Sequence, residues 1–186
     1  LRSFLRQDPD VMLVGEVRDL ETAQICIRSA LTGHLVLSTL HTNDAPSAVN
    51  RLMDIGIEPY MVAPSLLMVV AQRLVRKLCP DCKEAFEPTS EFIKSTGIKA
   101  GLIYKGKGCE KCNNNGYRGR TCIVEVMPVS PKIQELINQR AQFQRIREVA
   151  RAEGMQSLYQ SGIKKVDQGI TSFEEIISVT LGAENG

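Results

Sequence analysis

The sequence has 186 residues, of which 43% are hydrophobic and 24% charged, so it is typical of a soluble protein with one domain or two small ones. Its formal net charge of +2 is too small to indicate nucleic acid or an anionic membrane as a partner. The most apolar segment, residues 60–71, is shorter than the roughly 20 residues of a membrane-spanning helix. We therefore expect a buried helix from about Tyr60 to Lys77. Residues 1–10 lack the apolar region and cleavage site of a signal peptide, so we expect a protein that is not exported.

Strand and helix patterns alternate through residues 1–78, which favours an α/β fold. Val11–Val14 is a continuous apolar run, as in a parallel strand that is covered on both faces. A helix pattern follows it, and a second strand begins at Leu35–Leu37. We expect Thr42 or Asn43 to cap the next helix.

The pattern changes at Cys79. Residues 79–121 are rich in Lys, Gly and Asn and have weak periodicity, and they contain two C-x-x-C pairs. A strand is predicted at Cys122–Val126, and helices dominate the remainder, with Ser172 and Glu175 forming a capping box for the last helix. We therefore predict three parts: an α/β part at 1–78, a cysteine module at 79–121 and a mainly helical domain at 122–186.

Polar residues that can handle a phosphate or a water molecule directly follow both predicted strands. The first strand is followed by Gly15, Glu16 and Arg18, and the second by Thr39, His41 and Thr42. ATP hydrolysis needs a phosphate cradle, a magnesium ion, a group that orients water and cations that neutralise the γ-phosphate. Glu16 could align the water or accept its proton, and Arg18 could contact phosphate. Alternatively, these residues only lead from a strand into a capped helix.

His34 is a further candidate for nucleotide binding. It precedes the second strand and follows Gly33, which is placed to end a helix. That position equally suits a structural role.

Four of the six cysteines form the pairs Cys79–Cys82 and Cys109–Cys112. In a sequence without an export signal, two C-x-x-C pairs favour a metal over disulfides. Two such turns can complete a tetrahedral Cys₄ zinc shell, which leaves no open position and is therefore structural. Unligated thiols or a redox pair are the alternatives. The long spacer between the pairs predicts an inserted loop or helix near Glu91–Ser95.

The cysteine module also carries charge of both signs. Basic residues surround the second pair and could contact nucleic-acid phosphates: Lys105, Lys107, Lys111, Arg118 and Arg120. Four glutamates lie in the same module: Glu84, Glu87, Glu91 and Glu110. We interpret the module as a solvated charged face and expect no nucleic-acid partner, with a non-catalytic zinc-stabilised binding module as the alternative.

Several segments resemble one known family. RQDPDVMLVGEVRDLETAQ and TGHLVLSTLHTNDA resemble the Walker B and histidine boxes of secretion ATPases, the motors of type II secretion and type IV pilus assembly. CEKCNNNGYRGRTCIVEVMPVS is similar to the second cysteine pair of the type II secretion and pilus-extension motors, and DQGITSFEEIISVT to their C-terminal end. Retraction motors generally lack the cysteine element, which argues against retraction.

The resemblance implies the C-terminal part of a RecA-like P-loop core that works as a homo-hexamer with ATP and Mg²⁺. It makes Glu16 the Walker B acid, His41 the functional histidine and Arg18 a site residue. No G-x-x-x-x-G-K-[ST] phosphate loop occurs in the sequence, so we expect these 186 residues to be inactive alone.

The same resemblance implies a cytoplasmic bacterial protein on the inner membrane, bound to a membrane platform and a cytoplasmic adaptor and without a transmembrane segment. The segments RGRTCIVEV and KKVDQGITSFEE favour type II secretion, with pilus extension as the alternative.

Overall fold

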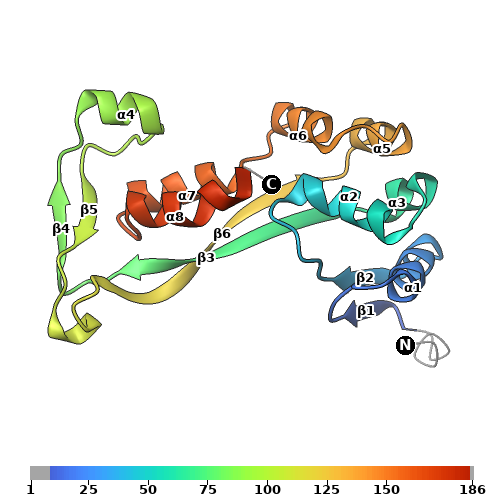
Figure 1. Cartoon of the computed structure of the whole chain (residues 1–186), viewed down its shortest axis with the longest axis horizontal. Coiled ribbons are helices and arrows are strands. Elements are labelled where there is room, and N and C mark those ends of the chain that lie inside the picture. The colour runs from blue at the N-terminus through green and yellow to red at the C-terminus, as the bar shows by residue number, and fades with distance from the viewer. Residues whose placement is uncertain (1–8, 185–186) are drawn as a thin grey trace. The chain divides into compact units, whose positions relative to one another are not determined.

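The computed structural model describes residues 9–184, with the side chains of residues 9–180. The chain forms two compact units, and Figure 1 labels their elements. Unit 1 is Leu1–Val70 with Val126–Met155, and unit 2 is Ala71–Glu125 with Gln156–Gly186. These two units are defined by packing, whereas the three parts expected from the sequence were assigned from motifs. The division into three parts therefore stays a prediction.

Unit 1 begins with a strand, a helix and a second strand: β1 (Val11–Val14), α1 (Leu20–Leu31) and β2 (Leu35–Ser38). β1 and β2 pair in parallel, with Val11 opposite Leu35 and Val14 opposite Ser38, as predicted. Met12 and Val14 are buried on one face, whereas Val11 and Leu13 on the other are 57% and 77% exposed. Within the described residues, this small sheet is therefore covered on one face.

Four helices complete unit 1: α2 (Ala45–Ile55), α3 (Pro59–Ser65), α5 (Pro131–Asn138) and α6 (Phe143–Ala152). α5 packs on α3, and α6 packs on α2. Asp44 caps α2 by accepting the N–H of Ser47 at 2.8 Å, so the predicted cap at Thr42 or Asn43 is wrong. Pro46, the second helical residue, fixes this start, because proline is favoured in the first turn of a helix.

The predicted helix from Tyr60 to Lys77 is also wrong. α3 ends at Ser65, and β3 (Met68–Leu78) follows after an extended Leu66. β3 buries Ala71 and Val75 and exposes the residues beside them, which is closer to a strand pattern than to a helical stripe. Pro64 lacks a backbone N–H and disfavours a longer helix, while the run of β-branched valines favours a strand.

Unit 2 is built around most of the paired strands β3 and β6 (Tyr117–Pro128). The cysteine region contributes β4 (Lys83–Phe86), α4 (Ser90–Thr96), β5 (Ile103–Gly106) and a 3₁₀ turn at Glu110–Cys112. β4 and β5 are antiparallel, with Lys83 opposite Gly106. α4 confirms the helix predicted between the cysteine pairs. The remaining helices are α7 (Leu158–Asp167) and α8 (Phe173–Glu184).

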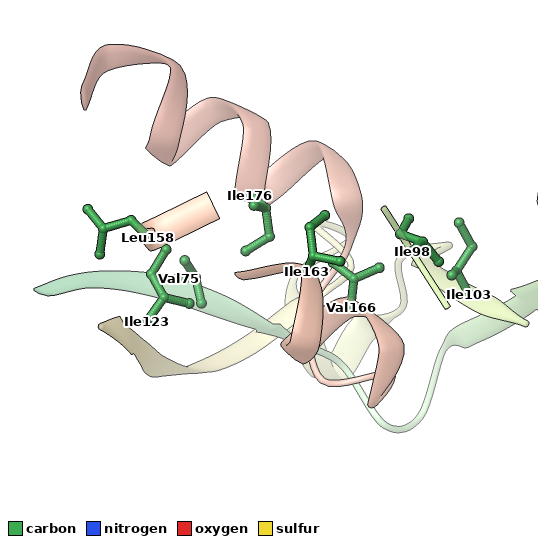
Figure 2. Close-up of a cluster of buried hydrophobic side chains, with 8 residues drawn as sticks. All are labelled: Val75, Ile98, Ile103, Ile123, Leu158, Ile163, Val166 and Ile176. Carbon is green, nitrogen blue, oxygen red and sulfur yellow. The ribbon is translucent and has the colours of Figure 1, made fainter. Parts of the chain in front are cut away.

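The core of unit 2 joins strands and helices from distant parts of the sequence (Figure 2). Its buried members are Val75, Ile98, Ile103, Ile123, Leu158, Ile163, Val166 and Ile176. A Cβ atom on Gly162 of α7 would lie 2.6 Å from Ile176 Cγ2 of α8, so only glycine permits this close helix packing. The shape of the core therefore depends on the α7–α8 contact.

An ion pair with a buried carboxylate joins α8 to β3. Glu175 is 5% exposed, and its carboxylate accepts the backbone N–H of Arg76 and two guanidinium N–H groups, at 2.8, 2.8 and 2.5 Å. Ser172 accepts the N–H of Glu175, as a capping box requires. The Glu175 side chain binds Arg76 instead of completing that box, so the capping prediction is half right.

Candidate active site and metal centre

The candidate catalytic residues meet at one edge of the β1–β2 sheet. Because the strands are parallel, their C-terminal ends lie at the same edge. Glu16 accepts from Arg18 Nη2 at 2.6 Å through one carboxylate oxygen, and its other oxygen lies 2.8 Å from His41 Nε2. Three residues that are separated by up to 25 positions thus form one polar cluster at the strand ends.

Two hydrogen bonds join the segments that follow β1 and β2. Val17 donates its N–H to the Thr39 carbonyl at 3.0 Å, and the Thr39 hydroxyl donates to the Gly15 carbonyl at 2.6 Å. A Cβ atom on Gly15 would meet no atom within 4 Å. The backbone here is therefore fixed by Thr39 but open to an approaching ligand at Gly15.

The charges around Glu16 determine its chemistry. The hydrogen bond from Arg18 lowers the pKa of Glu16, and the charges of Arg18 and His41 add to this against the effect of burial. A carboxylate with a lowered pKa is a weak proton acceptor, since a general base works best with a pKa near the working pH. Glu16 is therefore better suited to align a water molecule than to remove its proton fully.

The structure places the other two predicted nucleotide-site residues differently. Thr42 donates its hydroxyl to the Asp44 carbonyl at 3.2 Å, within the segment that leads from His41 to α2. His34 lies at the start of β2, which is the opposite edge of the sheet, and its Nδ1 is 3.0 Å from the Ser29 carbonyl of α1. The structure thus brings Gly15, Glu16, Arg18, Thr39 and His41 together but not His34. The catalytic and nucleotide-binding roles of all the candidate residues stay predictions.

The sequence analysis missed Asp44, which lies three residues after His41 at the start of α2. It caps α2, and its second carboxylate oxygen binds Arg147 of α6. Pro46 was the available signal, because a proline in the first helical turn places the cap just before it.

The four paired cysteines form one cluster in unit 2. All four Sγ atoms lie within 4.8 Å of one another, and those of Cys109 and Cys112 are 3.7 Å apart. These separations exceed the S–S bond length of about 2.05 Å, so the thiols are not joined as disulfides. The cluster offers four sulfur ligands to a single metal ion.

Backbone geometry shapes this cluster. Cys109 directly precedes the 3₁₀ turn and Cys112 ends it, and Asn113 and Asn114 follow with left-handed φ angles of 51° and 57°. The N–H groups of Cys109 and Gly116 donate to Cys112 Sγ at 3.2 and 3.3 Å. Burial opposes ionisation of Cys112, but these hydrogen bonds outweigh it and lower its pKa to about 7. Burial raises the pKa of Cys82 to about 12.

Close backbone approach and ion pairs join the two cysteine turns. A Cβ atom on Gly106 would lie 2.3 Å from the Gly116 carbonyl oxygen, so a glycine is needed there. Lys111 pairs with Asp81 at 2.5 Å, and Lys107 pairs with Glu84 at 3.1 Å. Several basic residues near the cluster are therefore engaged with neighbouring carboxylates.

The structure thus combines a mixed α/β fold with an acid, an arginine and a histidine at one strand edge and a tetracysteine cluster. A family model described as "Type II/IV secretion system protein" matches residues 1–178, and the chain belongs to this family. The fold class predicted from the sequence is thereby confirmed.

Individual relatives support the same family. The chain is 54% identical over 183 residues to the type II secretion system ATPase E of Vibrio cholerae serotype O1, covering 97% of this chain and 36% of that protein. It is 48% identical over 186 residues to the type IV pilus assembly ATPase PilB of Myxococcus xanthus, covering 97% and 33%. The chain thus spans about a third of the length of these curated relatives.

A solved structure shows the same fold. The crystal structure of the pilus retraction motor PilT with bound ADP matches with a TM-score of 0.66 and 27% identity, covering 96% of this chain and 41% of that one.

None of the helices in residues 9–184 combines the length and apolar character needed to cross a lipid bilayer.

Proposed function

We propose that this chain is the C-terminal part of a hexameric bacterial ATPase that powers type II protein secretion through pseudopilus assembly. The observation that carries the proposal is the position of Glu16 at the strand edge, held between Arg18 and His41. The 54% identity to a type II secretion ATPase supports it.

In the proposed reaction, the chain positions the water that attacks the γ-phosphate. Ionised Glu16 accepts a hydrogen bond from that water and aligns it for in-line attack. Arg18 and His41 fix the two carboxylate oxygens, and both are exposed enough to contact phosphate as its charge develops. Magnesium bound with ATP would neutralise phosphate charge. Gly15, Thr39 and Thr42 would shape the backbone next to the nucleotide, with His34 as a more distant contributor.

The rest of the full-length protein is proposed to complete this site. Val11, Leu13, Leu35 and Leu37 form an exposed apolar face on β1 and β2, whereas parallel sheets are normally covered on both faces. We infer that further parts of the full-length protein cover this face and supply the phosphate loop that binds ATP and Mg²⁺. The 186 residues alone are then expected not to hydrolyse ATP.

We propose that the cysteine cluster holds one structural zinc ion. Zinc–sulfur bonds of about 2.3 Å in a tetrahedron place the sulfur atoms roughly 3.8 Å apart. The Cys79–Cys109, Cys82–Cys112 and Cys109–Cys112 separations are 3.9, 3.8 and 3.7 Å, close to this value, and all four sulfur atoms lie within 4.8 Å of one another, which supports zinc as the ion. Four thiolate ligands leave no open position, so zinc would stabilise the fold of unit 2 and take no part in hydrolysis.

The proposed setting of the protein follows from its family. Secretion motors act in the cytoplasm at the inner membrane, so we propose a homo-hexamer bound to a membrane platform and a cytoplasmic adaptor. Pilus extension is the second candidate function, favoured by the 48% identity to a pilus assembly ATPase.

Complementation distinguishes the two functions. The full-length protein is expressed in a strain that lacks its type II secretion ATPase and, separately, in one that lacks its pilus-extension ATPase. We expect restored export of secreted enzymes in the first strain, which Glu16→Gln abolishes. Restored pili without restored export would favour the second function, and restoration of neither would contradict both.

A further inference from the structure

A buried ion pair joins α6 to the segment that carries His41. The Asp44 carboxylate is almost fully buried, and its Oδ2 accepts from Arg147 Nη2. Its Oδ1 accepts the N–H of Ser47 at 2.8 Å. The Arg147 guanidinium also lies 5.1 Å from the centre of the Phe143 ring, within cation–π range. Both oxygens of Asp44 are thus engaged, which gives this side chain one defined orientation.

The His41 side chain, in contrast, is not fixed by burial. Its side chain is 87% exposed, and it pairs with Glu16. The segment between β2 and α2 is anchored at its start by the Val17–Thr39 hydrogen bond. At its end it is anchored by Asp44, whose carbonyl also accepts the Thr42 hydroxyl. These contacts fix the backbone on both sides of His41.

We infer that Arg147 is a positioning residue for ATP hydrolysis: through Asp44 it holds the segment from His41 to Asp44 so that His41 stays aligned with Glu16. This inference rests on the proposed function. It connects α6, about a hundred residues further along the chain, to the reacting edge of the sheet. The competing explanation is that the pair only stabilises unit 1.

Steady-state kinetics of the full-length protein separate the two explanations. We expect Arg147→Ala to lower kcat about tenfold or more, because a misplacement of about 1 Å can cost on the order of 100-fold. The KM for ATP should stay within about twofold, since the transition state rather than ATP binding is affected. Arg147→Lys keeps the charge and should recover part of the rate.

Arg145→Ala is the matched control. Arg145 lies two positions earlier on α6 and pairs with exposed Glu148. The control should keep the wild-type rate. The wild type and Glu16→Gln are measured beside these variants: a wild type that does not hydrolyse ATP, or an unaffected Glu16→Gln, refutes the proposed function itself rather than the role of Arg147.

A second measurement does not depend on activity. The chain has two histidines, so ¹⁵N-histidine labelling of the 186 residues gives one ring spectrum each for His34 and His41. We expect Arg147→Ala to shift the His41 ring signals in the same direction as Glu16→Gln, with His34 unchanged. If Arg147→Ala also shifts the His34 ring signals to the values of the unfolded protein, the variant has unfolded. Arg147→Lys and Asp44→Asn are then measured instead and judged by the same criteria.

The inference is overturned by either of two results. One is an Arg147→Ala variant with the wild-type kcat. The other is an unshifted His41 signal in a variant whose thermal midpoint has fallen, which would show a purely structural pair.

Discussion

Replacing Glu175 by Gln should destabilise unit 2 measurably. The buried carboxylate accepts three hydrogen bonds from Arg76, one from the backbone and two from the guanidinium. Gln keeps the size but has one acceptor oxygen and no charge. Hydrogen bonds to charged groups contribute about 1.5–3 kcal/mol each. Because Arg76 is about half exposed, solvent screens part of this contribution, and we expect a net loss of about 2 kcal/mol.

Urea unfolding at neutral pH measures this loss. Three of the four tyrosines, Tyr104, Tyr117 and Tyr159, lie in unit 2, so tyrosine fluorescence reports mainly on its unfolding. Glu174→Gln is the matched control, because Glu174 is exposed in the same first turn of α8. Equal stability of the two variants would refute the role assigned to the Arg76–Glu175 pair.

The difference should also depend on pH. Burial acts to raise the pKa of Glu175, but the hydrogen bonds from Arg76 outweigh it, so the folded-state pKa is lowered. A lowered folded-state pKa gives stability that is fully present above the unfolded value of about 4.3. It is lost as the pH falls through the folded value. The free energy of unfolding of the wild type should therefore exceed that of Glu175→Gln most at neutral pH. The difference between the two free energies should become smaller below about pH 4.

Two further predictions concern unit 2. Protein purified without chelator should contain about one zinc ion per chain, as one Cys₄ site requires. The Cys79→Ser, Cys82→Ser double variant should lose it; metal analysis that finds no zinc in the wild type would contradict the site. Gly162→Ala should cost about 1–3 kcal/mol, because the new methyl group overlaps buried Ile176. Gly101→Ala, where a Cβ meets no atom within 4 Å, should cost far less in the same unfolding measurement, and equal losses would contradict the packing argument.

The sequence predicted the features that depend on local pattern. The apolar runs at β1 and β2 carry a strand signal that is strong enough to place Glu16 and His41 at strand ends. The C-x-x-C spacing similarly brings four cysteines together without knowledge of the fold. In both cases the residue types and their spacing are sufficient.

The missed features depend on contacts between distant residues. The apolar segment after Tyr60 fits a helix or a strand by composition, and pairing of β3 with β6 decides for a strand. Asp44 and Arg147 are 103 positions apart, and Arg76 and Glu175 are 99 apart. No local sequence pattern predicts such pairs, because in the sequence each of these residues is indistinguishable from an exposed charged residue.

ATP hydrolysis by the full-length protein carrying Glu16→Gln tests the central claim most directly. The Gln side chain keeps the size of Glu16 but carries no negative charge with which to accept the hydrogen bond of the water. We expect a rate at least about 100-fold below that of the wild type, in the range for the loss of a general acid–base group. Glu91→Gln, an exposed change in the first turn of α4, should leave the rate intact. Equal rates for wild type and Glu16→Gln would remove Glu16 from the mechanism and contradict the account.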